Sequence, residues 1–222
     1  MKAMILAAGR GERMRPLTDQ TPKPLLIAAG KPIIEYTILQ LVAAGFTDIV
    51  INTAHLGGQL PTVLGNGARW GANINYSHEG EQALETAGGI INALPLLGEE
   101  PFLVVNGDIA TDFNFAKLHQ QPIALAYLVL ISNPSHHEQG DFYLAANGQL
   151  SSIETPKLTF SGIGVYHPDL FRHQPAGIRK LAPILRAAML EHKVSGEHFE
   201  GFWMDIGTPE RLQALHAHYS TP

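Results

Sequence analysis

The chain has 222 residues, of which 45% are hydrophobic and 16% charged, which is typical of a folded domain and excludes wholesale disorder. The net charge of −5 argues against a general nucleic-acid-binding protein, and no apolar run reaches the roughly 18 residues of a membrane-spanning helix. Cysteine is absent, which excludes disulfides, thiolate metal sites and cysteine nucleophiles. The N-terminal residues lack a signal-peptide pattern, so we expect a cytoplasmic protein, either a monomer or a homodimer.

In the first half of the chain, short apolar runs alternate with segments of helical periodicity. Strands are predicted at residues 2–7, 48–52, 73–77 and 102–105. Helices are predicted at residues 33–44, 56–64 and 87–97, and prolines interrupt the last two. This alternation is typical of a parallel sheet with helices on both faces.

After Asp108 the pattern changes and strands predominate. They are predicted at residues 123–131, 141–145, 149–154, 158–166 and 198–203, with a hairpin turn at Asn147-Gly148. Helices are predicted at residues 180–191 and 208–219. The sheet is therefore expected to be mixed, within one α/β domain.

Positive charge is concentrated at the start of the chain. The first 31 residues carry six basic and two acidic side chains, so they sum to +4 while the remainder sums to −9. A solvated basic face is the simpler interpretation. However, the stretch is rich in glycine and proline, and positive charge on a glycine-bearing loop is what a phosphate site requires.

A glycine-rich loop follows the first predicted strand. Gly9 and Gly11 allow backbone N–H groups to approach an anion, and Arg13 can donate paired hydrogen bonds to phosphate. Met14 stands where a dinucleotide fingerprint needs its third glycine, and the chain has no Walker A pattern, so neither of those sites is predicted. Lys23 lies between two prolines, which hold the backbone extended and reduce the entropy lost in placing this lysine.

Several motifs together resemble the signature of the sugar-1-phosphate nucleotidyltransferases. They are Leu6-Ala-Ala-Gly-x-Gly-x-Arg-Met-x-Pro-Leu-Thr18, Pro22-Lys23-Pro24, Asn106-Gly107-Asp108 and Trp203-Met-Asp-Ile-Gly-Thr-Pro209. The resemblance implies a Rossmann-like (GT-A-like) three-layer α/β sandwich, whose mixed central sheet is mostly parallel with a small antiparallel portion. It also implies a single domain over residues 1–222, with a nucleotide-binding part at about 1–110 and a sugar-phosphate-binding part at about 111–222.

Within that family, residues 133–142, 180–186 and 195–199 are most similar to the compact N-acetylmuramate α-1-phosphate uridylyltransferases of peptidoglycan recycling. The resemblance implies an enzyme that transfers UMP from UTP to a sugar 1-phosphate, with Mg²⁺ as cofactor and pyrophosphate as the second product. Two alternatives stay open. One is a mannose-1-phosphate or glucose-1-phosphate nucleotidyltransferase that uses GTP, UTP or dTTP, and the other is a non-catalytic nucleotide-sugar-binding protein.

The resemblance also implies roles for individual residues. Arg13, Lys23 and Asp108 are expected to be catalytic, the two cations by stabilising negative charge on the phosphates and Asp108 by binding the metal. No general base is expected, because the sugar phosphate is itself largely ionised at neutral pH. Glu12 stands where many relatives have threonine, so only its backbone N–H is expected to bind phosphate. The nucleotide-binding residues are expected to be Ala7, Ala8, Gly9, Gly11, Glu12, Arg13, Lys23, Gln82 and Gly88.

Asp108 and Asp205 each follow a predicted strand, although 97 residues separate them. Mg²⁺ prefers a few carboxylates together with phosphate oxygens and water, which a converging pair of aspartates would provide. Each aspartate could instead belong to a turn or a helix N-cap. With their flanking motifs, both are predicted to bind the metal.

The sugar-phosphate site is expected to contain Asn106, Asp141, Glu154 and Lys180. Neutral sugar groups need matched donors and acceptors, which such side chains offer. The consecutive pair His136 and His137 invites a metal interpretation, but no third ligand stands at a suitable spacing. We therefore predict a solvated loop there.

Overall fold

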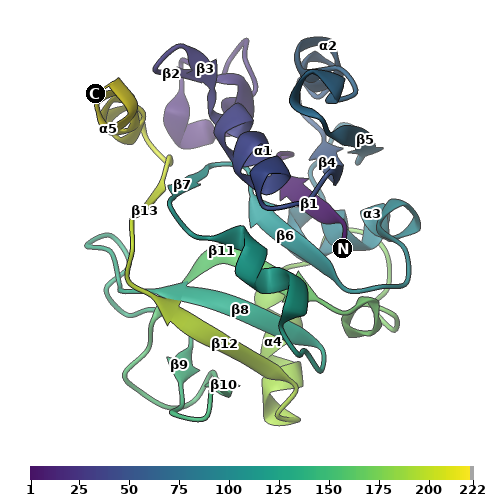
Figure 1. The fold of residues 1–222 in the computed structure, drawn as a ribbon, viewed down its shortest axis with the longest axis vertical. Helices are drawn as coiled ribbons and strands as arrows, with labels where there is room; N and C mark the ends of the chain where they lie inside the picture. Colours follow the sequence, from purple (N-terminus) through teal and green to yellow (C-terminus); the bar gives the residue numbers. More distant parts are fainter. Residues whose placement is uncertain (221–222) are drawn as a thin grey trace.

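A seven-stranded mixed sheet forms the centre of the structure, a computed structural model in which residues 1–220 are described (Figure 1). The N-terminal strands pair in parallel, whereas β11 runs antiparallel to both of its neighbours. The spatial order is β12 (Val194–Phe199), β8 (Ala126–Ile131), β11 (Thr159–Tyr166), β6 (Phe102–Asn106), β1 (Ala3–Leu6), β4 (Asp48–Thr53) and β5 (Asn73–His78). The mixed, mostly parallel sheet predicted from the sequence is confirmed.

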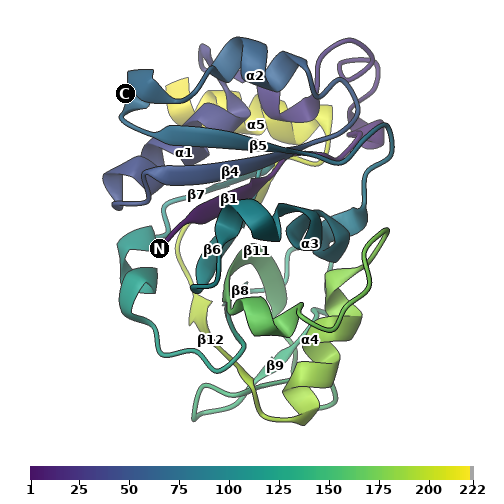
Figure 2. The same cartoon turned by 90° about the vertical axis from the view of Figure 1, so that its right-hand side faces the viewer.

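Helices cover both faces of this sheet. Ile5 of β1 packs in the core cluster that includes α1 (Ile33–Ala43), while its neighbour Met4 packs in the cluster that includes α3 (Glu85–Leu97) and α4 (Leu181–Leu190). Figure 2 shows α3 and α4 next to one another. Because a buried parallel strand carries apolar side chains on both faces, it gives a continuous apolar run in the sequence.

A small second sheet joins two segments that are distant in the chain. β7 (Ile109–Thr111) pairs antiparallel with β13 (Trp203–Asp205), which leads into α5 (Pro209–Ser220). The N–H of Ile206 donates to the carbonyl oxygen of Asp108 at 2.7 Å. This pairing brings the second half of the chain back to the end of β6.

The predicted strand at residues 198–203 is wrong. β12 ends at Phe199 and β13 begins at Trp203, so the prediction spans the turn between two strands of different sheets. Gly201 lies in that turn, where an added Cβ would stand 2.3 Å from the ring of Phe199. Apolar and aromatic residues flank the turn on both sides, which is why the pattern conceals it.

The other elements differ from the predictions mainly in length. The hairpin at Asn147-Gly148 is confirmed but is short, with β9 (Tyr143–Leu144) and β10 (Leu150–Ser151), and α2 is confined to Gln59–Leu64. The strand β7 was not predicted from the sequence. The hairpin of β2 and β3 and all the short 3₁₀ turns were not predicted either. These elements are β2 (Ile27–Ala28), β3 (Lys31–Pro32), η1 (Glu12–Met14), η2 (Lys23–Leu25), η3 (Ala68–Trp70), η4 (Phe115–Gln120) and η5 (Pro168–Leu170).

The main sheet takes strands from both sides of residue 110, and the division into two binding parts there stays a prediction. Among the described residues, no helix combines the length and the apolar character needed to cross a bilayer.

Candidate functional site

The carboxyl ends of β1, β4 and β6 meet at one edge of the sheet, where a pocket of about 380 Å³ opens. Ligands of open α/β sheets bind at this edge, because the loops after the strands gather there. Predicted site residues that line the pocket are Ala7, Ala8, Gly9, Lys23, Asn106 and Asp108. Lining residues that the sequence analysis missed are Asn52, Glu79, Glu85 and Thr86.

The glycine-rich loop turns sharply at Gly11, which has a left-handed φ of 64°. Its carbonyl oxygen accepts hydrogen bonds from the Met14 N–H and the Thr18 hydroxyl, at 2.9 and 2.8 Å. An added Cβ at Gly11 would lie 3.0 Å from Thr18 and 3.1 Å from Lys23. Both the backbone conformation and the close packing therefore require glycine at this turn.

The loop's charged side chains lie outside the pocket lining. Glu12 and Arg13 are exposed, and neither they nor Gly11 line the pocket, so their contact with nucleotide stays a prediction. The Arg13 guanidinium lies beside Gly207. A Cβ added to Gly207 would stand 3.2 Å from Arg13 Nη2 and 2.8 Å from Asp205 Oδ2. The structure thus brings Arg13 to the second aspartate motif.

Lys23 is buried at the start of η2 and points at Asp108. Its Nζ lies 2.5 Å from Asp108 Oδ2, and the Asp108 side chain keeps 37% of its surface exposed. Gly107, just before Asp108, lets the end of β6 lie close to the end of β1, because an added Cβ would stand 2.7 Å from the carbonyl oxygen of Leu6. The N–H of Gly107 donates to that same oxygen at 2.9 Å, which fastens the end of β6 to the end of β1.

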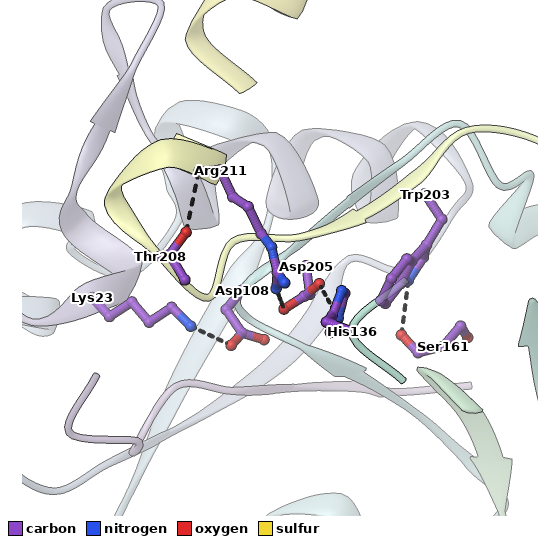
Figure 3. A network of polar contacts seen from close by, with 8 residues as sticks. All are labelled: Lys23, Asp108, His136, Ser161, Trp203, Asp205, Thr208 and Arg211. Atoms are coloured by element: carbon purple, nitrogen blue, oxygen red, sulfur yellow. Dashed lines mark hydrogen bonds and ion pairs between the residues drawn. The ribbon is translucent and has the colours of Figure 1, made fainter. Parts of the chain in front are cut away.

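Asp108 and Asp205 lie close together, as Figure 3 shows, because the β7–β13 pairing places Asp205 opposite Ile109. The Asp205 carboxylate pairs with the Arg211 guanidinium through Oδ2 and with His136 Nε2 through Oδ1, the latter at 3.2 Å. His136 is exposed and lies in a loop, as predicted, and its ring also reaches Asp205, next to the proposed metal site. The chain has no local pattern that links it to Asp205, because 69 residues separate them.

The donor set suits a hard divalent cation that shares its shell with substrate. Among residues 1–220 there is no cluster of three or more histidine, aspartate or glutamate side chains able to hold a metal alone. Two neighbouring carboxylates suit Mg²⁺, which usually keeps water and phosphate oxygens as its other ligands. The metal role of Asp108 and Asp205 stays a prediction.

A second pocket of about 290 Å³ adjoins the first and shares Glu85, Thr86 and Asn106 with it. Two further residues of the predicted sugar-phosphate site, Asp141 and Lys180, also line it. The Asp141 carboxylate accepts from the Phe160 N–H at 2.8 Å through Oδ2 and lies 3.1 Å from His137 Nε2 through Oδ1. The pocket therefore offers fixed polar groups beside an apolar wall.

Glu154 lies outside the second pocket. It is exposed and accepts a hydrogen bond from Ser151, so its predicted contact with the sugar has no support from its position. Lys157 donates to the carbonyl oxygen of Ser152 at 2.8 Å within the same loop.

Two of the predicted nucleotide-binding residues are Gln82, in the loop before α3, and Gly88, in the first turn of α3. Gln82 is exposed and does not line the first pocket, although its neighbour Ala83 does. Gly88 is buried, and an added Cβ would stand 2.3 Å from the carbonyl oxygen of Gly177. Its position indicates close packing against the 177–179 loop, and its contact with nucleotide stays a prediction.

Comparison with known proteins agrees with this geometry. Residues 2–221 match the model of the Nucleotidyl transferase family. The chain is 52% identical over 98% of its length to the N-acetylmuramate alpha-1-phosphate uridylyltransferase of Neisseria meningitidis serogroup B, of which the alignment covers 97%. It is 34% identical over 97% of its length to the protein of that name from Caulobacter vibrioides, of which 95% is covered.

A solved structure from Bacillus anthracis, described as a glucose-1-phosphate thymidylyltransferase, shares the fold. It superposes with a TM-score of 0.86 at 24% identity, covering 100% of this chain and 96% of that one. The chain therefore belongs to the nucleotidyl transferase family.

Proposed function

We propose that this protein transfers UMP from UTP to N-acetylmuramate α-1-phosphate, giving UDP-N-acetylmuramate and pyrophosphate in peptidoglycan recycling. The observation that carries the proposal is the convergence of Lys23, Asp108 and Asp205 beside two pockets that share Asn106. One pocket adjoins the glycine-rich loop and suits a nucleotide, and the other suits a sugar. The similarity to the Neisseria enzyme over nearly the full length of both chains supports these substrates.

The reaction needs stabilisation of negative charge more than acid–base chemistry. The nucleophile is a phosphate oxygen of the sugar 1-phosphate, whose second pKa of about 6 leaves it largely ionised at neutral pH. It attacks the α-phosphorus of UTP, and the bond from that phosphorus to the bridging oxygen breaks as pyrophosphate leaves with the electron pair. The barrier comes mainly from bringing two polyanions together, which fixed cations and oriented amides reduce.

Lys23 and Arg13 are the proposed fixed cations. The buried stem of Lys23 restricts its ammonium group to the pocket next to Asp108, so little ordering remains when substrate binds. Arg13 lies beside Gly207, in the segment that carries Asp205. Because residue 11 is glycine, no side chain crowds the backbone N–H groups of the loop at this turn.

We propose Mg²⁺ as the cofactor, held by Asp108 and Asp205 together with phosphate oxygens and water. When bound, the ion neutralises charge on the reacting phosphates. The hydrogen bond from the Ile206 N–H to the Asp108 carbonyl oxygen keeps the two aspartate-bearing segments in register.

The sugar 1-phosphate is proposed to bind in the second pocket, through Asn106, Asp141 and Lys180. The His137 and Phe160 contacts hold the Asp141 carboxylate in one orientation, which suits recognition of sugar hydroxyl or amide groups. A cytoplasmic location is proposed together with these substrates.

A substrate panel tests the proposal. Purified protein with Mg²⁺ is assayed for pyrophosphate release using UTP, GTP and dTTP, each with N-acetylmuramate, mannose or glucose 1-phosphate. We expect the UTP and N-acetylmuramate α-1-phosphate pair to give a kcat/KM at least tenfold above the other pairs. A higher value with mannose-1-phosphate and GTP would identify the alternative enzyme, and no release with any pair would indicate a non-catalytic binding protein.

A further inference from the structure

We propose that Asn52 and Glu79 form a hydrogen-bonded brace, and that this brace positions the 80–84 loop against the first pocket, the proposed nucleotide pocket. Glycine at position 89 of α3 makes room for the brace. The inference rests on the proposed nucleotide site. It assigns these residues a positioning role in nucleotide binding.

The brace ties together the ends of three strands. Asn52, near the end of β4, is 3% exposed, and its Oδ1 accepts from the Ala7 N–H after β1 at 2.6 Å. Its Nδ2 donates to Glu79 Oε1, just after β5, also at 2.6 Å. The second carboxylate oxygen of Glu79 accepts from the Leu84 N–H at 2.7 Å. One continuous set of hydrogen bonds therefore runs from Ala7 to the loop that leads into α3.

The residues of the brace face the nucleotide pocket. Ala7, Asn52 and Glu79 all line it, and so does Ala83, the neighbour of the bonded Leu84. Fixing the Leu84 N–H therefore fixes the backbone that presents Ala83 to the pocket. Losing any of the three hydrogen bonds would break the connection between Ala7 and Leu84 and loosen this wall of the pocket.

Gly89 gives an independent observation on the same feature. An added Cβ there would stand 2.4 Å from Glu79 Oε1 and 2.9 Å from Asn52 Nδ2, the two atoms of the central hydrogen bond. A side chain at this position of α3 would displace that bond. Glycine lets the helix backbone pack directly onto the brace.

The direction of each hydrogen bond in the brace, from donor to acceptor, is fixed by the backbone N–H groups at its two ends. The Ala7 and Leu84 N–H groups can only donate, so Asn52 turns its oxygen to Ala7 and its amide to Glu79. Glu79 must then accept from two donors, one at each carboxylate oxygen, and a glutamine offers only one oxygen. Glu79→Gln leaves one donor facing another donor, whereas Asn52→Asp sets two carboxylates against each other.

The double variant N52D/E79Q restores every hydrogen bond with the polarity of the middle one reversed. The new carboxylate at position 52 accepts from the Ala7 N–H and from the new amide at position 79, while the amide oxygen at position 79 accepts from the Leu84 N–H. The net charge is unchanged. The matched control is D48N, because the Asp48 carboxylate accepts from Asn73 Nδ2 at 3.0 Å across the opposite ends of the same two strands.

The experiment measures steady-state KM and kcat by pyrophosphate release, and nucleotide binding by calorimetry without sugar. The nucleotide is the one that the wild-type protein turns over best in the panel, so an incorrect choice of UTP does not decide the result. We expect E79Q to raise the nucleotide KM and dissociation constant at least tenfold, with the sugar-phosphate KM within twofold of wild type. The double variant should return within threefold of wild type, and D48N should match wild type.

A nucleotide KM within twofold of wild type in E79Q would overturn the proposal. The proposal would also be overturned if the double variant had a nucleotide KM no lower than that of E79Q. The same holds if E79Q raised the KM of both substrates equally and lowered the melting temperature. Failure of the wild-type protein to turn over any substrate pair would refute the proposed function, while the calorimetric comparison, made then with UTP, would still decide the role of the brace.

Discussion

Replacing Lys23 by methionine keeps the buried stem and removes only the ammonium group. Lys23 is 8% exposed, and its Nζ lies 2.5 Å from Asp108 Oδ2. Two quantities respond to this change for different reasons. The rate falls because a cation is lost from the reacting phosphates, and the stability falls because a carboxylate loses its partner.

The effect on rate follows from the value of one preorganised donor to developing negative charge. Loss of such a donor removes about 2.7–4 kcal/mol of transition-state stabilisation, or about 10²–10³ in rate. We therefore expect K23M to lower kcat/KM at least 100-fold. Pyrophosphate release under saturating Mg²⁺ measures this loss.

The effect on stability depends on burial. Exposed ion pairs contribute about 0–1 kcal/mol, whereas breaking a fully buried pair costs about 3–5 kcal/mol. The Lys23 side chain is 10% exposed and the Asp108 side chain 37%, so the pair is intermediate. We expect a loss of about 1–2 kcal/mol, which for a chain of this length lowers the melting temperature by about 2–8 °C.

The double variant K23M/D108N separates the two effects. The double variant removes the carboxylate that K23M leaves unpaired. Calorimetry should therefore show that most of the lost melting temperature is recovered, whereas pyrophosphate release is not. A K23M enzyme within tenfold of the wild-type kcat/KM would refute the charge-stabilising role. A melting temperature that D108N does not restore would refute the role of the ion pair in stability.

Three further variants and one chelation experiment test the rest of the site. Asp108→Asn and Asp205→Asn should each abolish turnover while leaving the circular dichroism spectrum unchanged, and more than a tenth of wild-type activity in both would contradict the metal assignment. Chelation of divalent cations should stop pyrophosphate release and added Mg²⁺ should restore it; turnover that persists in the chelator would exclude the metal requirement. Gly107→Ala should destabilise the fold by about 1–3 kcal/mol, because its Cβ would stand 2.7 Å from the Leu6 carbonyl oxygen, and an unchanged melting temperature would show that this approach is not tight.

Local features were predictable from the sequence, because their causes lie within a few residues of chain. Apolar runs identified the parallel strands, since strands buried on both faces need apolar side chains at every position. The turn at Gly11 follows from the conformational freedom of glycine. The extended backbone predicted at Lys23 is wrong, because Lys23 begins the 3₁₀ turn η2 and only the flanking Pro22 and Leu26 are extended. The resemblance of these same segments to a known family predicts that this loop binds phosphate.

Boundaries and turns were less predictable. The turn at residues 200–202 separates β12 from β13, yet the segment reads as one strand because both flanks are rich in apolar residues. Nothing in the local pattern of Trp203 indicates that it pairs with Thr111 in a different sheet.

The convergence of distant groups was decided only by the tertiary structure. Asp205 reaches Asp108 through the β7–β13 pairing, His136 reaches Asp205 from a loop, and Glu79 meets Asn52 across two strands. Each contact depends on strand register, and a slip of one residue would turn the side chain to the opposite face. Register is set by the packing of the whole core, so the sequence by itself determined which groups are present, and folding determined which of them meet.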